Sequence, residues 1–239
     1  IPAVAIGIGL IVGVLFFRRQ TRLIDPLIDV RLFKQRGFNA ALLTNIFSLF
    51  IIFGTFLFIA QYLQLVLGLG PFEAGLWTAP SGLIFAVGSM AAPYLARTFA
   101  PHRVIALGFL VSALGFGYLT QLDGVTSPWP MFAGMVVFCL GLSPIGAITT
   151  DLVMAEAPPE RAGAASAISE TSFEFGGALG IAVLGSIVTA VYRSAMTRDL
   201  PQGLSPEAFD VAQDTLGGAV HVAGQLGGEA GAALLAVSR

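Results

Sequence analysis

The stretch AGAASAISETSFEFGGALGIAVLGSIVTAVY (residues 162–192) contains two acids, Glu170 and Glu174, and no other charged residue. Its length and apolarity predict a membrane-spanning helix, because about 20 apolar residues cross a bilayer as helix. Ionised carboxylates are costly at bilayer depth, so they normally face a protein interior or a water-filled path and mark ion or substrate routes. Residues four apart share one face of a helix, roughly one turn apart. The pair therefore predicts a polytopic transporter that moves protons or cations.

The composition also indicates a membrane protein. The chain is 56% hydrophobic and only 11% charged over 239 residues, whereas soluble domains carry about a quarter charged residues. No Lys or Arg occurs in residues 38–96 or 104–160. The net charge of −2 gives no sign of nucleic-acid binding, and the single cysteine, Cys139, allows neither a disulfide nor a thiolate metal site within this chain. These features predict an all-α integral membrane fold.

Six apolar segments have the length of membrane spans. They are residues 1–17, 38–64, 73–96, 103–122, 129–155 and 161–192. Several follow directly after a proline, which is favoured in the first turn of a helix. Three prolines inside spans, Pro80, Pro93 and Pro144, predict kinks.

The distribution of basic residues predicts the orientation. Nine of them lie in three loops, residues 18–37, 97–103 and 156–161, and the intervening loops have none. Basic loops stay on the cytoplasmic side, so we expect these three inside and residues 193–239 outside. This is the topology of a multi-pass plasma-membrane protein, in a bacterium the inner membrane.

The two ends differ from the centre. The chain starts at Ile1, with no Met and already inside an apolar run, so we expect an incomplete start. Residues 193–239 are rich in Ala and Gly, and Ser205-Pro206-Glu207 is typical of a helix start. A weak apolar stripe from Phe209 to Val220 predicts one short surface helix there.

Three blocks carry a family resemblance: DPLIDVRLF, QYLQLVLG followed by GPFEAGL, and APPERAGAASAISETSFEFGGALGIAVLGS. They resemble the C-terminal half of the fourteen-helix drug:proton antiporters of the major facilitator superfamily. The resemblance covers Arg18 to Tyr192. It implies a partial major-facilitator bundle of about six transmembrane helices.

The resemblance also implies a domain order. Residues 1–17 would be a truncated linker transmembrane helix and 18–37 a basic cytoplasmic loop. Residues 38–192 would form five helices of the C-terminal bundle, and 193–239 an extracytoplasmic segment before a missing last helix. The missing N-terminal half would be a partner of this one.

The loop 97–103 aligns with the superfamily's cytoplasmic gating loop but is degenerate. It keeps basic ends, Arg97 and Arg103, and lacks the Asp and Gly of that motif. Asp151 and Arg161 fall at the same predicted end of the bundle, and Arg161 is expected to pair with Asp151, Glu156 or Glu160. These residues are interpreted either as a cytoplasmic gate or as a salt-bridged structural corner.

Two helices provide candidate transport residues. On residues 161–192 the acids share a small, polar face with Gly177. The adjoining Gly176 and Gly180 allow close helix packing, and all three glycines are expected to serve helix packing. A polar stripe on residues 38–64 predicts either cavity lining or helix contacts; it consists of Asn45, Ser48, Thr55 and Tyr62.

The predicted function is proton-coupled export of amphipathic or cationic small molecules, as in multidrug efflux and drug resistance. A buried carboxyl next to a like charge holds its proton more tightly, and a cationic substrate can displace that proton. The alternatives are an intramembrane enzyme that uses the carboxylates as acid and base, and a non-transporting membrane sensor. We expect no enzyme activity, cofactor, metal site or catalytic residue. The expected partners are the small-molecule substrate, protons and membrane lipid.

Overall fold

The computed structural model describes residues 2–23, 26, 28, 31–122, 127–199 and 206–238. Every regular element in these residues is helical. Five helices are long and apolar enough to cross a membrane, and they coincide with five of the predicted spans. They are α2 (Arg36–Gln61, continued by the π-helical turn η2, Tyr62–Val66), α3 (Pro71–Thr98), α4 (Pro101–Leu119), α5 (Pro128–Ala155) and α6 (Ala162–Asp199).

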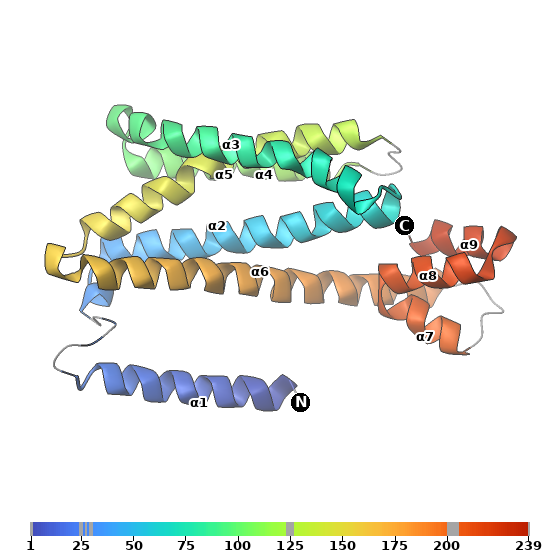
Figure 1. The fold of residues 1–239 in the computed structure, drawn as a ribbon, viewed down its shortest axis with the longest axis horizontal. Helices are drawn as coiled ribbons and strands as arrows, with labels where there is room; N and C mark the ends of the chain where they lie inside the picture. The colour runs from blue at the N-terminus through green and yellow to red at the C-terminus, as the bar shows by residue number, and fades with distance from the viewer. Residues whose placement is uncertain are drawn as a thin grey trace.

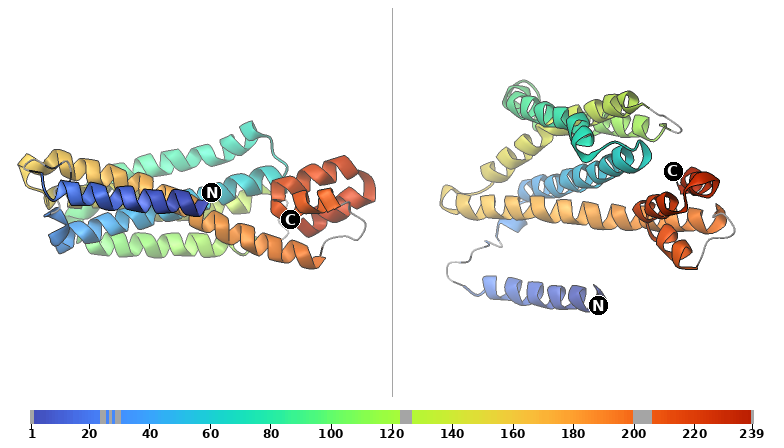
Figure 2. Two further views of the ribbon diagram at one scale, coloured as in Figure 1. Left: turned by 90° about the horizontal axis from the view of Figure 1, so that it is seen from below. Right: turned by 45° about the vertical axis from the view of Figure 1, so that its right-hand side comes forward.

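The first predicted span corresponds to α1, Pro2–Gln20. This helix is not one of the five spans found among the described residues. Figures 1 and 2 show it separated from the other helices. Most of the side chains that the structure describes in α1 are accordingly exposed, Leu10 at 67% for example, whereas Gln20 at its end is buried. The first residue and the connection at residues 24, 25, 27, 29 and 30 lie outside the described residues.

The helix α5 forms the centre of the bundle, with α2, α3, α4 and α6 packed around it (Figure 1). Fully buried Met135, Phe138 and Leu142 form the middle of the main core together with Ile59 and Leu63 of α2 and η2. Figure 1 also shows α5 changing direction along its length. Pro144 lies inside this helix, as expected of a proline kink.

Prolines begin several helices, as the sequence predicts. Pro71, Pro101 and Pro128 each occupy the first turn of α3, α4 and α5. A backbone N–H in the first turn of a helix has no acceptor within the helix, so proline, which lacks this N–H, costs no hydrogen bond there. The short 3-10 turn η3 (Pro159–Arg161) leads into α6 in the same way.

The basic loops gather at one end of the bundle. Arg36, Arg97, Arg103 and Arg161 lie where α2 begins, α3 ends, α4 begins and α6 begins. We call this the basic end; it is on the left in Figure 1. The alternation of helix directions thus agrees with the predicted loop order.

The last predicted span is longer than expected. Instead of ending at Tyr192, α6 continues to Asp199, so its 38 residues measure about 57 Å. This exceeds the roughly 30 Å of a bilayer core. The final turns of α6 therefore project beyond the membrane and carry the C-terminal segment.

The sequence predicted one short surface helix in this C-terminal segment, and beyond Asp214 that prediction is wrong. The structure has three short helices, α7 (Pro206–Asp214), α8 (Leu216–Leu226) and α9 (Gly228–Ser238), which we call the cap. The first of these helices ends at Asp214, and α8 begins directly after Thr215. The Thr215 hydroxyl accepts a hydrogen bond from the Gly218 N–H at 3.0 Å and so caps α8. Ser205 lies outside the described residues.

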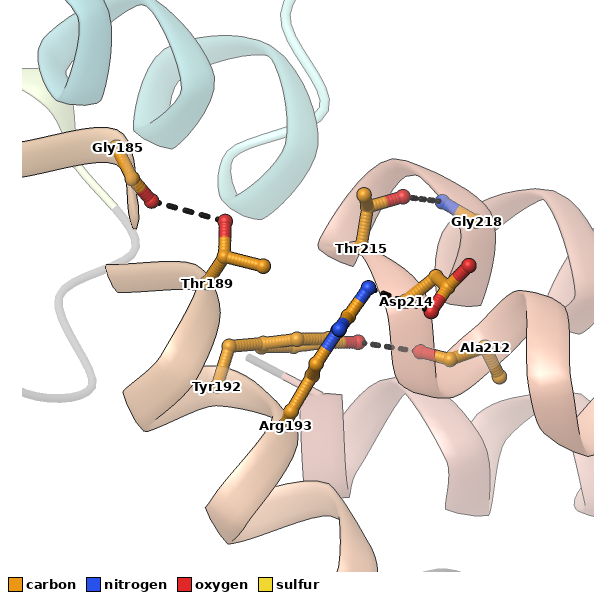
Figure 3. Close-up of polar contacts among 8 residues, drawn as sticks. All are labelled: Gly185, Thr189, Tyr192, Arg193, Ala212, Asp214, Thr215 and Gly218. Carbon is orange, nitrogen blue, oxygen red and sulfur yellow. Dashed lines mark hydrogen bonds and ion pairs between the residues drawn. The ribbon is translucent and has the colours of Figure 1, made fainter. Parts of the chain in front are cut away.

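The cap packs on the end of α6 (Figure 3). The Tyr192 hydroxyl donates to the Ala212 carbonyl at 2.9 Å, and Arg193 pairs with Asp214 at 2.8 Å. Buried Met196 of α6 and Leu234 of α9 belong to a separate small core. The cap is therefore anchored by apolar packing as well as by polar contacts.

Candidate functional site

Glu170 and Glu174 lie on an exposed face of α6, which we call the acidic face. Counted from Ala162, they stand about 12 Å and about 18 Å along the helix. A bilayer core about 30 Å thick that began at Ala162 would hold both acids near its middle. No other part of the described chain covers them.

The side of α6 next to the acidic face packs tightly against α2. A Cβ added at Gly176 would lie 2.5 Å from the carbonyl oxygen of Ile46, and one at Gly180 would collide with the carbonyl of Phe50. Gly177 is in contact with the Phe53 ring, where an added Cβ would come within 3.1 Å. These glycines bring the two backbones together, and this packing fixes the direction in which the acidic face points.

A hydrogen-bonded cluster links three helices at the basic-end half of the bundle. The Thr149 hydroxyl of α5 donates to the Asn45 side-chain oxygen of α2 at 2.9 Å, and the Asn45 amide donates to the Ser169 hydroxyl of α6 at 3.3 Å. Asn45 and Thr149 are 0% exposed. Asn45 therefore lines no water-accessible cavity. It makes helix–helix contacts, which were the alternative prediction for the polar stripe. Sequence analysis missed Thr149 and Ser169. The polar pair Thr149-Thr150 within an apolar span is a signal that could have identified the Thr149 contact.

A cavity of about 680 Å³ lies between α2, α3, α5 and α6. Its volume is within the range of small-molecule sites, roughly 300–1,000 Å³. The wall is apolar with hydroxyl groups from Ser48, Ser89, Ser143 and Thr150, and Asp151 is its only charged residue. Ser48 was predicted to line a cavity, whereas Ser89, Ser143 and Thr150 were not singled out.

The cavity and the acidic face adjoin each other on α6. Phe173 lines the cavity, and it follows Glu170 by three residues and immediately precedes Glu174. Residues three apart are neighbours on a helix surface. Phe173 therefore stands between the cavity and the acids, a position that sequence analysis did not identify.

Thr55 and Tyr62 line a different cavity. This one measures about 290 Å³ and is bounded by α2 and η2, by the last turns of α4 and by the start of α5. It lies toward the end opposite the basic end. The predicted polar stripe is thus divided among a buried cluster and two separate cavities.

The predicted salt-bridged corner is not formed by the acids expected to make it. In the part of the chain that the structure describes, Asp151, Glu156 and Glu160 form no ion pair. Asp151 faces the large cavity. The Glu156 carboxylate lies over Gly37 at the start of α2, where an added Cβ would be 2.7 Å from Cδ.

The basic residues assigned to the gate lie at the basic end on separate elements. Arg97 and Arg103 are exposed on α3 and α4, and Arg161 is half-buried in η3. Within the described residues no three His, Cys, Asp or Glu side chains form a group that could hold a metal ion.

Fold and site together define an all-helical bundle of membrane-spanning length, with two exposed acids on one of its long helices. This chain belongs to the Major Facilitator Superfamily, whose family model matches residues 1–181. It is therefore part of a multi-pass membrane protein, and in bacteria such proteins lie in the inner membrane.

Several similar proteins are named for drug efflux or for resistance to a toxic compound. The multidrug efflux pump LfrA of Mycolicibacterium smegmatis is 38% identical over 224 residues, covering 94% of this chain and 44% of that protein. The methyl viologen resistance protein SmvA of Salmonella typhimurium is 33% identical, covering 94% and 45%. The lincomycin resistance protein LmrB of Listeria innocua is 29% identical, covering 85% and 43%. The chain thus spans somewhat under half the length of these relatives.

Proposed function

We propose that the protein exports amphipathic or cationic small molecules in exchange for protons, with Glu170 and Glu174 as the coupling acids. The observation that carries this proposal is the exposure of both carboxylates on a helix that is long and apolar enough to cross a membrane. Ionised carboxylates that face lipid would carry a high free-energy cost. They are therefore directed at a water-filled path or at protein that is not part of this chain.

Relatives about twice as long offer such a surface. In transporters of this architecture the substrate site lies near the bilayer midplane, between two helical repeats that rock against each other. The acidic face of α6 has the right depth to contribute to a site of that kind. Negative charge at that depth is costly without a partner, and a cationic substrate or a proton supplies the compensating positive charge.

The large cavity supports the same proposal. Its apolar and hydroxyl wall suits an amphipathic molecule, and Asp151 provides one negative charge at its basic end. Because Phe173 lines this cavity and is a neighbour of both acids on α6, the two regions adjoin and a bound cation can contact both. We assign Asp151 to substrate contact or gating, and we place the basic end on the cytoplasmic side.

Transport into proteoliposomes under an imposed pH gradient tests the proposal. Methyl viologen, the dication in the name of a relative, serves as one probe and an organic monocation as the other. We expect Glu170→Gln or Glu174→Gln to abolish dication export first, because a dication needs both charges, and the double change to abolish both activities.

The matched control is Glu207→Gln, which neutralises an exposed acid on α7 in the cap. It should transport at the parental rate. Parental proton-coupled transport by the double Gln variant would show that the acids are structural, and the proposal would fail.

A further inference from the structure

A second cavity of about 290 Å³ opens on the side of the bundle away from the acidic face. It lies between the end of α3 and the first half of α4, and α5 forms its floor. Its apolar wall includes Phe99, Leu107, Val111 and Leu140, and Arg103 is its only charged residue. We call it the arginine groove.

The arginine groove faces the region that lipid occupies. Its wall belongs to helices that are long and apolar enough to cross a membrane, and α4 packs mainly against α5. Leu107 is 63% exposed, Phe99 54% and Leu140 52%. Side chains so apolar are unfavourable in contact with water, so hydrocarbon is the matching occupant.

Arg103 lies at the mouth of the arginine groove. It is the third residue of α4, at the basic end, where a membrane helix meets the polar headgroups. Among the described residues no carboxylate pairs with it. From Arg103 to Val111 the groove follows α4 for about 12 Å, close to the roughly 15 Å depth of one leaflet.

We propose that the arginine groove is a binding site for an anionic phospholipid. Arg103 binds the phosphate, since guanidinium and phosphate form charge-assisted bidentate hydrogen bonds, and one acyl chain occupies the apolar part. Basic pockets between membrane helices bind anionic headgroups by the same chemistry. The volume fits part of a single chain, and the arginine groove shares no lining residue with the large cavity and does not include the two acids.

Native mass spectrometry of the detergent-purified protein tests this, titrated with dioleoyl phosphatidylglycerol or with dioleoyl phosphatidylcholine. We expect tighter retention of phosphatidylglycerol. Arg103→Gln should weaken it about fivefold, the effect of one basic residue near an anionic surface, and Arg103→Lys should keep most of the preference.

Two matched controls locate the effect. Arg97→Gln removes an exposed charge at the same end but outside the arginine groove and should retain phosphatidylglycerol like the parent. Leu140→Trp fills the groove and should reduce retention, whereas Leu114→Trp, at a 66% exposed position elsewhere on α4, should not.

An equal loss in Arg97→Gln and Arg103→Gln would mean that only bulk charge attracts the lipid. That result would overturn the proposal. So would unchanged retention of phosphatidylglycerol by Arg103→Gln, or the absence of a preference for phosphatidylglycerol over phosphatidylcholine in the parent.

Discussion

Asn45 shows how much one buried side chain depends on residues far away in sequence. Its two partners, Thr149 and Ser169, are 104 and 124 residues distant. A polar stripe on one helix predicts that Asn45 faces something polar, and no local pattern predicts whether that is a cavity or another helix. The role of Asn45 is therefore decided by packing of α2 against α5 and α6.

We expect the Asn45–Thr149 contact to stabilise the bundle modestly. Polar contacts between membrane helices average about 0.6 kcal/mol and reach about 1.7 kcal/mol, because the unfolded chain in the membrane also finds partners. A double-mutant cycle of Asn45→Ala and Thr149→Val, measured by denaturant unfolding in detergent, should give a coupling energy in that range.

The control for this cycle pairs Asn45→Ala with Thr171→Val. The Thr171 hydroxyl is exposed and bonds only the Ala167 carbonyl of its own helix, at 2.8 Å. Its coupling to Asn45 should be close to zero. A coupling equal to that of Thr149 would show that the cycle reports a general loosening of the bundle.

At the scale of elements, the α2–α6 interface decides where the acids point. The Gly176 and Gly180 contacts leave no room for a side chain between the two backbones. The sequence predicts this close approach from its glycine spacing, and the structure identifies α2 as the neighbour. Any change that separates the helices also turns or tilts the acidic face.

Gly176→Ala should therefore destabilise the protein, by about 1–3 kcal/mol for overpacking, since the new methyl group would press on the Ile46 backbone. Gly185→Ala provides the comparison on the same helix, because an added Cβ there meets nothing within 4 Å. It should be neutral or slightly stabilising. Thermal unfolding in detergent measures both, and equal melting temperatures would contradict the described packing.

The spans and the cap differ in how well the sequence predicts them. Long apolar segments and the prolines near their ends predict the bounds of α2 to α5 within a few residues. Both signals can be found in the local sequence, because bilayer thickness sets the length of a span and proline favours a helix start. In the cap, α8 and α9 have neither signal: these Gly- and Ala-rich helices are stabilised by Met196 and by one another. Likewise, no pattern within residues 161–192 shows that α6 continues to Asp199.

For the whole molecule, the basic end and the cap lie at opposite ends of the bundle (Figures 1 and 2). We predict that they face opposite sides of the membrane, with the basic end inside. Single cysteines at exposed Thr21 and Gln225 should then react with a membrane-impermeant maleimide from the inner and the outer side, respectively. Gln20, next to Thr21, is only 3% exposed and unsuited to labelling.

This labelling requires a background without other accessible cysteines. Cys139 is fully buried in α5 and should remain unlabelled until the protein is denatured. Reaction of both introduced cysteines from the same side would contradict the orientation and the number of spans between them.

The central claim, that Glu170 and Glu174 exchange a proton for a cation, is tested most directly by substrate-induced proton release. The purified protein in weakly buffered detergent at pH 7 is mixed with an organic dication, and a pH indicator records the protons released. The parent should release protons in proportion to the dication bound, and the Glu170→Gln, Glu174→Gln double variant should release none. Equal release by the parent and the double variant would contradict the account.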